Sequence, residues 1–118
     1  MERDKEPKEI VKELVSRYIK AKPTRIRLKL NYSNDNSSIS IKGKDLDETA
    51  DYHKAIDFTS FANGVLEAFR EVYGELKAIP ISFREEIYEN DKVRLDLYPT
   101  GSAGIFDIFV EYKILEEW

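Results

Sequence analysis

Glu85 and His53 are the residues whose chemistry stands out first. Glu85 has the same parity as Phe83 and Ile87 in an alternating segment, so the pattern predicts a carboxylate that points into the core. Such a carboxylate would have a raised pKa and could act as a general acid or base. With Tyr112 and His53 it would form the mouth of a small-molecule pocket. A β-bulge or a strand end at this point would instead turn Glu85 outward.

Metal and cofactor chemistry is restricted by composition. The 118 residues include no cysteine and one histidine. This excludes disulfides, thiolate zinc sites, iron–sulfur clusters and cysteine nucleophiles, and it removes metal sites with two histidines unless a second chain contributes one. We therefore expect no metal and no cofactor, and we favour a protein that is not an enzyme.

A basic strand face is the strongest polar constellation. Residues 1–44 contain 12 Lys or Arg and 6 Asp or Glu, whereas the remaining residues contain 7 and 17. Alternation and a hairpin would place five cations on one face, where they could bind an anion or a polyanion; these are Arg25, Arg27, Lys29, Lys42 and Lys44. The pI of about 5.1 and the lack of interleaved aromatic residues argue against nucleic acid. The same face could simply protect a sheet edge, or pack against the acidic half.

An aromatic face with a charged rim is expected on the last strands. Residues of the outward parity include aromatic, aliphatic and charged side chains, a mixture typical of protein interfaces. The predicted interface consists of Arg84, Tyr88, Arg94, Asp96, Tyr98, Ile105 and Phe109. Residues 45–57 or Trp118 could instead fold over this face.

Two amphipathic helices must support these surfaces. Apolar residues recur with helical spacing from about residue 7 to 21 and again from 57 to 76. Pro7 suits a first helical turn, and Asp57 is a suitable N-cap. Gly64 in the second helix would allow another element to approach closely.

Alternating segments predict five strands. A first hairpin has its turn near Asp35 and Asn36, which would place Lys29 opposite Lys42 and Arg27 opposite Lys44. Like charges opposite each other are destabilising, so this register either recruits an anion or is wrong.

The last third predicts a three-stranded meander. Its strands cover residues 79–87, 93–97 and 106–114, with a turn at 89–91 and another at Gly101–Ser102. In this register Ile87 lies opposite Val93 on the core side, and Glu86 lies opposite Arg94. Residues 45–57 fit either a weak helix or a short strand.

These patterns predict one α+β domain over residues 1–118. The predicted architecture is a two-layer α/β sandwich with the order α-β-β-α-β-β-β, in which both helices pack on one face of an antiparallel sheet. We expect a cytoplasmic protein, because residues 1–6 are charged and no apolar run approaches the length of a membrane span. The leading functional hypothesis is a non-catalytic protein-binding domain of inhibitor, immunity or adaptor type, which binds a protein partner or a second copy of itself. The enzymatic pocket and the anion-binding hairpin are the alternatives.

Overall fold

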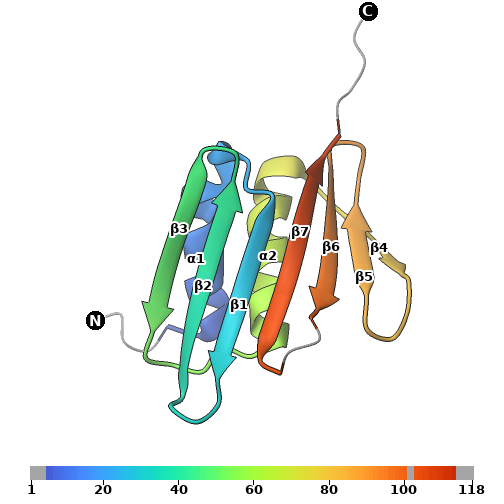
Figure 1. Cartoon of the computed structure of the whole chain (residues 1–118). Helices are drawn as coiled ribbons and strands as arrows, with labels where there is room; N and C mark the ends of the chain where they lie inside the picture. Colours follow the sequence, from blue (N-terminus) through green and yellow to red (C-terminus); the bar gives the residue numbers. More distant parts are fainter. Residues whose placement is uncertain (1–4, 101–102, 114–118) are drawn as a thin grey trace, which may run out of the picture.

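The chain forms one antiparallel sheet with two helices on one of its faces (Figure 1). The computed structural model describes residues 5–100 and 103–113. The strand order across the sheet is β3-β2-β1-β7-β6-β5-β4. The elements in chain order are α1 (Pro7–Tyr18), the short 3₁₀ helix η1 (Ile19–Ala21), β1 (Arg25–Asn31), β2 (Asn36–Gly43), β3 (Leu46–Tyr52), α2 (Phe58–Tyr73), β4 (Lys77–Pro80), β5 (Glu86–Glu89), β6 (Val93–Pro99) and β7 (Ile105–Tyr112).

This arrangement confirms the predicted two-layer α+β sandwich. Both helices lie on one side of the sheet, and the hydrophobic core fills the space between the two layers (Figure 1). The largest fully buried side chains come from both layers and include Phe61 and Phe69 of α2 and Ile26, Ile39 and Ile108 of the sheet. The opposite face of the sheet, here called the outer face, carries no helix within the described residues.

The helix termini follow from local chemistry. Pro7 lies in the first turn of α1, where a missing N–H costs no hydrogen bond. The Asp57 carboxylate accepts a hydrogen bond from the Ser60 N–H at 2.8 Å and thereby caps α2. At the end of η1, Lys22 adopts a left-handed conformation with φ 56°, and the chain turns there toward β1.

Gly64 sets the distance between the two helices. A Cβ atom placed on Gly64 would lie 2.7 Å from the Val11 Cβ and 2.8 Å from the Lys8 carbonyl oxygen. Ion pairs reinforce the crossing, from Lys8 to Glu67 at 2.8 Å and from Lys12 to Glu71 at 2.6 Å, although exposed pairs contribute little individually. The close approach predicted from the sequence is confirmed.

Residues 45–57 contain an edge strand, β3, and the connection from it to α2, and they form neither a helix nor a cover over the outer face. β3 pairs with β2 along its length, from Gly43↔Leu46 to Ser37↔Tyr52. The buried Ser37 hydroxyl accepts a hydrogen bond from the Ile56 N–H at 2.7 Å, which fixes the connection from β3 to α2. The sequence pattern did not distinguish a helix from a strand here, because only one face of β3 contacts the core and Glu48 interrupts the apolar residues of that face.

The predicted single strand over residues 79–87 is wrong. It is a hairpin in which β4 pairs with β5, with Ile79 opposite Ile87. The Ile81 and Ser82 N–H groups both donate to the Glu85 carbonyl, and the Ser82 hydroxyl accepts from the backbone of the same turn. Within residues 5–100 and 103–113 the sheet therefore has seven strands, two more than predicted.

The predicted pairing of the next strands is also wrong. Ile87 lies opposite Asp96, and Glu89, rather than Glu86, lies opposite Arg94. This shift moves Ile87 to the outer face and places Tyr88 on the helix side, opposite Leu95. An odd shift in register exchanges the two faces of a strand.

The first hairpin has a longer turn than predicted. Asn31 pairs with Asn36, so residues 32–35 form the turn. As a result Lys29 lies opposite Ser38 and Arg27 opposite Ser40, and the predicted like-charge pairs do not form. The shift is even, so the predicted faces of both strands are correct.

Three predictions lie outside the described residues. They concern the Gly101–Ser102 turn, the end of the last strand at Ile114, and Trp118 as a cover of the outer face. In the part of the chain that is described, neither helix is long and apolar enough to cross a lipid bilayer.

Gly64→Ala should lower the free energy of unfolding by about 1–3 kcal/mol, because the added methyl group overpacks the contact with α1. The loss should occur even though alanine favours a helix over glycine by about 1 kcal/mol. Urea denaturation measures the change. Asn63→Ala, at an exposed position on the same helix, is the matched control and should leave stability equal or higher. A stabilised Gly64→Ala protein would contradict the close crossing.

Candidate functional site

The outer face is organised in rows that run across the strands. One row crosses the entire sheet, and its residues are, from β3 to β4, Asp47, Lys42, Arg25, Phe109, Asp96, Ile87 and Ile79. The row changes from charged to apolar at the junction of β1 and β7. At this junction the Arg25 guanidinium lies 5.7 Å from the centre of the Phe109 ring, a cation–π distance.

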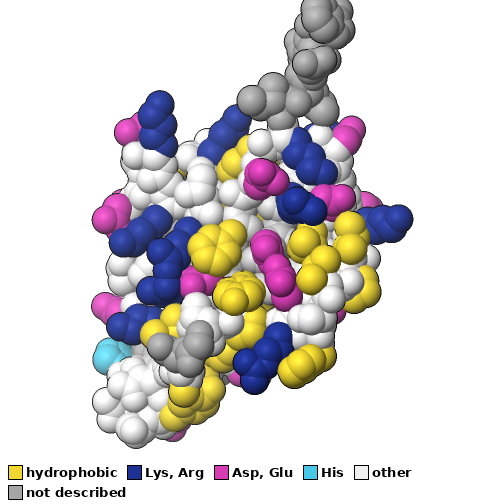
Figure 2. Space-filling model, turned by 45° about the vertical axis from the view of Figure 1, so that its right-hand side comes forward, with side chains coloured by type: hydrophobic (Ala, Val, Ile, Leu, Met, Phe, Trp, Pro, Cys, Tyr) yellow, Lys and Arg dark blue, Asp and Glu magenta, His cyan; other side chains and the backbone are white. Residues whose placement is uncertain are grey.

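The half of the outer face formed by β7, β6, β5 and β4 is rich in apolar groups. Tyr98, near the end of β6, and Phe109, in the middle of β7, remain 48% and 40% exposed. Figure 2 shows hydrophobic side chains gathered over these strands, with acidic and basic side chains among them. This half is called the apolar face below, and its residues are Ile79, Ile87, Tyr98, Ile105 and Phe109.

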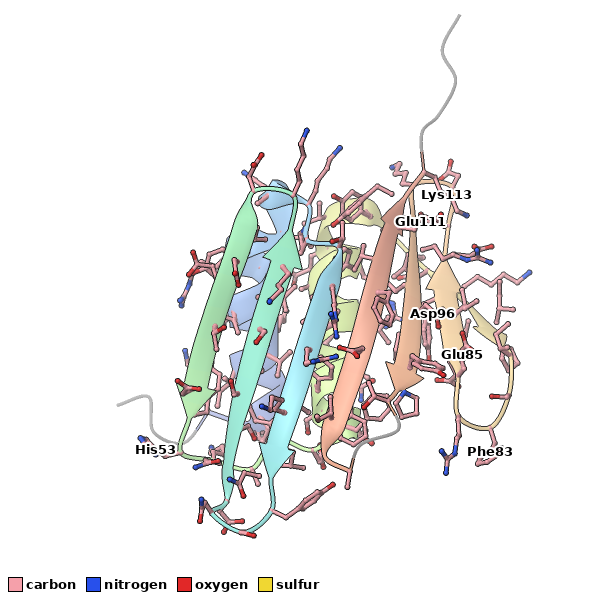
Figure 3. The ribbon with its side chains drawn as sticks, in the orientation of Figure 1. His53, Phe83, Glu85, Asp96, Glu111 and Lys113 are labelled. Carbon is pink, nitrogen blue, oxygen red and sulfur yellow. The ribbon has the colours of Figure 1, made fainter. Side chains whose placement is uncertain are left out.

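Asp96 lies in the middle of the apolar face, directly between Phe109 and Ile87. Its Oδ1 atom is buried and accepts no hydrogen bond from a described residue. Burial first, and then the hydrogen bond that a protonated Asp96 can make with the neighbouring Glu85 and the negative charge of Glu85, raise the pKa of Asp96 to about 6, while Arg94 opposes the rise. Figure 3 shows Glu85 and Asp96 close together on the outer side of β5 and β6. Two adjacent carboxyl groups therefore form the polar centre of this face.

Glu85 does not point into the core, which corrects the prediction. It ends the turn between β4 and β5, and its side chain is half-buried on the outer side (Figure 3). The alternation that suggested an inward orientation belongs to two different strands and the turn between them. Phe83, which shares that alternation, is 94% exposed.

Charged residues at one end of the apolar face pair with one another. The Arg94 guanidinium lies 3.3 Å from a Glu89 carboxylate oxygen and 3.9 Å from one of Glu111. Lys113 reaches the same Glu89 oxygen at 3.1 Å and donates to the Asn90 carbonyl at 2.7 Å. This end of the apolar face is therefore polar and close to neutral.

A buried carboxylate holds two arginines on the other half of the outer face. Asp107 is 1% exposed and accepts from the Arg27 Nε and Nη2 at 2.9 and 3.0 Å and from the Arg25 Nε at 3.2 Å. The bidentate bond fixes the plane of the Arg27 guanidinium. This role of Asp107 was not predicted from the sequence. It follows from the pairing of β7 with β1, which places Asp107 opposite Arg27.

Four of the five predicted anion-binding residues come together. Together with Ser40, they line a hollow of about 120 Å³; they are Arg25, Arg27, Lys29 and Lys42. Lys44 does not belong to this group, because the longer turn moves it out of β2 into the exposed connection to β3. This corrects its predicted position opposite Arg27.

Five of the seven predicted interface residues lie on the outer face, and two do not. Tyr88 lies on the helix side, where its hydroxyl donates to Glu86 at 3.0 Å. Arg84 lies in the β4–β5 turn, 5.5 Å from the centre of the Phe83 ring. The five that share the face are Arg94, Asp96, Tyr98, Ile105 and Phe109. Ile79 and Ile87 were predicted to be inward and join them because of the register shift.

The three residues of the predicted small-molecule pocket lie in separate places. His53 follows β3 at one side of the sheet, whereas Glu85 lies near the other (Figure 3). The Tyr112 hydroxyl donates to the Pro23 carbonyl at 3.0 Å, and burial raises the pKa of this phenol well above its usual range. In the part of the chain that the structure describes, these three residues do not share a pocket.

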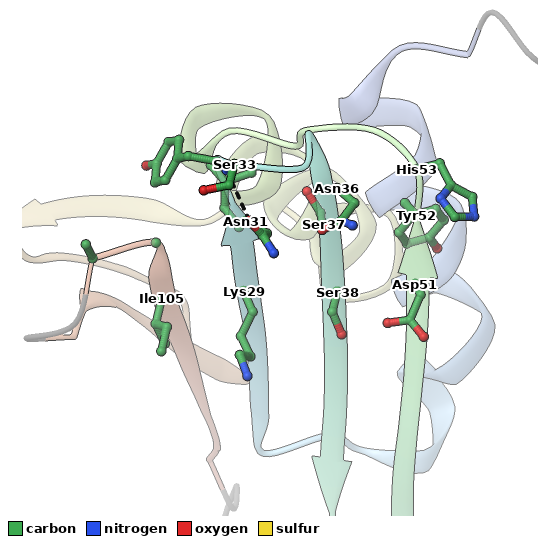
Figure 4. Close-up of a pocket in the computed structure, with 14 residues that line it drawn as sticks. Lys29, Asn31, Ser33, Asn36, Ser37, Ser38, Asp51, Tyr52, His53 and Ile105 are labelled. Atoms are coloured by element: carbon green, nitrogen blue, oxygen red, sulfur yellow. Dashed lines mark hydrogen bonds between the residues drawn. The ribbon is translucent and has the colours of Figure 1, made fainter.

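His53 instead lines an open cleft of about 530 Å³ at the end of β1, β2 and β3 (Figure 4). Lys29, Ser38 and Asp51 line it as well, and Figure 4 shows His53 directed away from them. Within the described ranges, no hydrogen bond links these four side chains to one another, and no group of three or more His, Asp or Glu residues could hold a metal ion. The cleft thus shows no assembled catalytic group.

Comparisons of the chain with known proteins found no relative. The chain matches no protein-family model, no curated protein and no solved structure. The function must be argued from the geometry of the outer face.

Glu85→Gln should lower the pKa of Asp96 from about 6 toward 3.8, because the amide removes a negative charge and can donate a hydrogen bond. The shift should be partial, since burial is the larger cause. NMR titration of the Asp96 side-chain carboxyl carbon measures it. Glu86→Gln is the matched control, because it makes the same substitution at the next residue, whose side chain lies on the helix side of the sheet. It should leave the pKa of Asp96 unchanged.

The pH dependence of the free energy of unfolding is a second measurement of the interaction between Glu85 and Asp96. The folded-state pKa of Asp96 lies above the unfolded value, so the folded protein binds more protons and loses stability as pH rises from about 4 to about 6. This loss should be smaller in Glu85→Gln than in the wild type. An identical pH dependence in both proteins would contradict the pairing.

Asp107→Ala should lower the free energy of unfolding by about 2–3 kcal/mol, because two guanidinium groups would lose their shared carboxylate. The expected value is below that of a fully buried pair, since both arginines are about one-third exposed. Chemical denaturation measures the loss. Asp47→Ala, at an exposed site on the same face, should change stability by less than about 0.5 kcal/mol.

Proposed function

We propose that this protein is a small, non-catalytic protein-binding domain that binds its partner through the apolar face. The observation that carries the proposal is that Phe109 and Tyr98 remain 40% and 48% exposed on a sheet face that no described helix covers, next to Asp96. Ile79 is half-buried and Ile87 is buried in the same face. Exposed aromatic residues surrounded by a polar rim are typical of the centre of a protein interface.

The partner should bring a cationic group to the middle of this face. In the free domain the buried Asp96 Oδ1 accepts no hydrogen bond from a described residue, and Glu85 places a second carboxyl beside it. A buried acceptor without a partner is costly, so a Lys or Arg side chain of the bound protein would relieve that cost. A shallow hollow of about 180 Å³ beside Asp96, lined also by Arg94, Phe109 and Glu111, gives such a side chain access.

Both edges of the sheet disfavour binding by strand addition. β4 has only four residues and ends with Pro80. β3, at the other edge, exposes Asp47, Glu48 and Asp51. Short strands, proline and charge all discourage pairing with another strand. The face of the sheet is the better-supported contact surface, and an inhibitor, immunity or adaptor role in the cytoplasm remains our prediction for it.

Site-specific photo-crosslinking tests the proposal in cells that express the protein. p-Benzoylphenylalanine in place of Phe109 or Tyr98 should give a discrete protein adduct. The same group in place of Tyr32, which is 66% exposed in the β1–β2 turn, should give none. The Phe109 adduct should weaken at least fivefold when Asp96→Asn removes the charge that the partner's cation meets.

Each result bears on the proposal. An adduct of twice the chain mass would identify the partner as a second copy, and light scattering at low and high salt would then give the oligomeric state. No adduct at either face position, or equal labelling at position 32, would contradict binding through the apolar face. Circular dichroism of each variant establishes that the fold is retained.

A further inference from the structure

The basic half of the outer face contains a second site that the proposed interface does not use. We infer that the hollow between β1 and β2 binds the phosphate group of a small phosphomonoester. Its walls are four cationic side chains and the Ser40 hydroxyl, around a volume of about 120 Å³. The four cations are Arg25, Arg27, Lys29 and Lys42.

The two arginines are held in place before any ligand arrives. The carboxylate of Asp107, itself buried, uses one N–H donor of Arg25 and two of Arg27. Each guanidinium has five donors, so four on Arg25 and three on Arg27 have no acceptor within the described residues. Fixed guanidinium groups with free donors recognise phosphate oxygens at a low cost in conformational entropy.

Charge in the hollow is not balanced by the protein. Asp107 offsets one of the four positive charges. Lys29 and Lys42 form no ion pair in the part of the chain that the structure describes, and Lys42 has only the exposed Asp47 opposite it on β3. The net charge close to the hollow is therefore clearly positive, on a protein whose overall charge is −4.

Size and surroundings favour one phosphate group over an extended polyanion. A volume of about 120 Å³ is well below the 300–1,000 Å³ typical of pockets that enclose a drug-sized ligand. Acidic residues flank the cations on both sides, with Asp47 and Asp51 on β3 and Asp96 on β6. A nucleic acid backbone that continued beyond the hollow would meet these carboxylates. The Phe109 ring next to Arg25 offers an apolar contact for the organic part of a small ligand.

Titration with inorganic phosphate and with phenyl phosphate, at constant ionic strength, tests the site. The Arg25 and Arg27 Nε–Hε signals in NMR spectra should shift saturably with both probes, and phenyl phosphate should bind more tightly. Lys29→Met and Lys42→Met should each weaken binding about tenfold, because each removes a charged hydrogen-bond donor. Lys20→Met removes the same charge from the helix side of the molecule and should change affinity less than twofold.

Several outcomes would overturn the inference. One is a response to phosphate that equals the response to sodium chloride at the same ionic strength, which would show screening alone. Another is an equal loss in Lys20→Met and Lys42→Met. A third is tighter binding of single-stranded oligonucleotides than of phenyl phosphate, with an affinity that increases with oligonucleotide length. This result would show an extended binding surface for polyanions instead. Phe109 borders both sites, so phenyl phosphate can contact the apolar face. Inorganic phosphate and the two lysine variants do not involve Phe109 or Asp96, so their failure would count against this hollow alone and leave the apolar face untouched.

Discussion

The structure depends on a mismatch between the width of its sheet and the number of its helices. Seven strands about 4.8 Å apart make a sheet roughly 30 Å wide, whereas two helices packed 8–10 Å apart cover only part of one face. Gly64 brings α1 and α2 closer together, which improves their contact but does not widen the cover. The whole outer face, and the β4–β5 hairpin beyond α2 in Figure 1, must be stabilised in other ways.

The two halves of the outer face differ in the side chains that they present to solvent. On β1 and β2 the alternation of charged and polar residues keeps the surface hydrated, and Asp107 offsets the repulsion between Arg25 and Arg27. On β7 to β4 apolar and charged side chains are mixed, and Phe109 and Tyr98 remain partly exposed to water. Asp96 adds a carboxyl group to the middle of the apolar face, and its partial burial there raises its pKa.

The sequence predicted the layers of this fold better than its registers. Long amphipathic patterns identified both helices, because each presents one stripe to a continuous core. The hairpin of β4 and β5 could not be recognised, because Ile81 and Phe83 continue the alternation of Ile79 through a turn where they are largely exposed. β3 was ambiguous for the opposite reason. As an edge strand it carries more polar than apolar residues, so alternation alone could not separate it from a weak helix.

The same errors explain which parts of the candidate sites could be foreseen. The turn of the first hairpin was predicted wrongly, but the resulting register shift was even. The predicted faces of both strands were therefore correct, and the basic hollow contains Arg25, Arg27, Lys29 and Lys42 as expected. The apolar face gained Ile87 and lost Tyr88 because the shift between β5 and β6 was odd. The carboxyl pair of Glu85 and Asp96 joins a turn to a strand, so no periodic pattern contains it. It becomes visible only when the strands are paired, and it then explains why an acidic residue can remain between Phe109 and Ile87: the position gives the apolar face a polar centre that a complementary cation can complete.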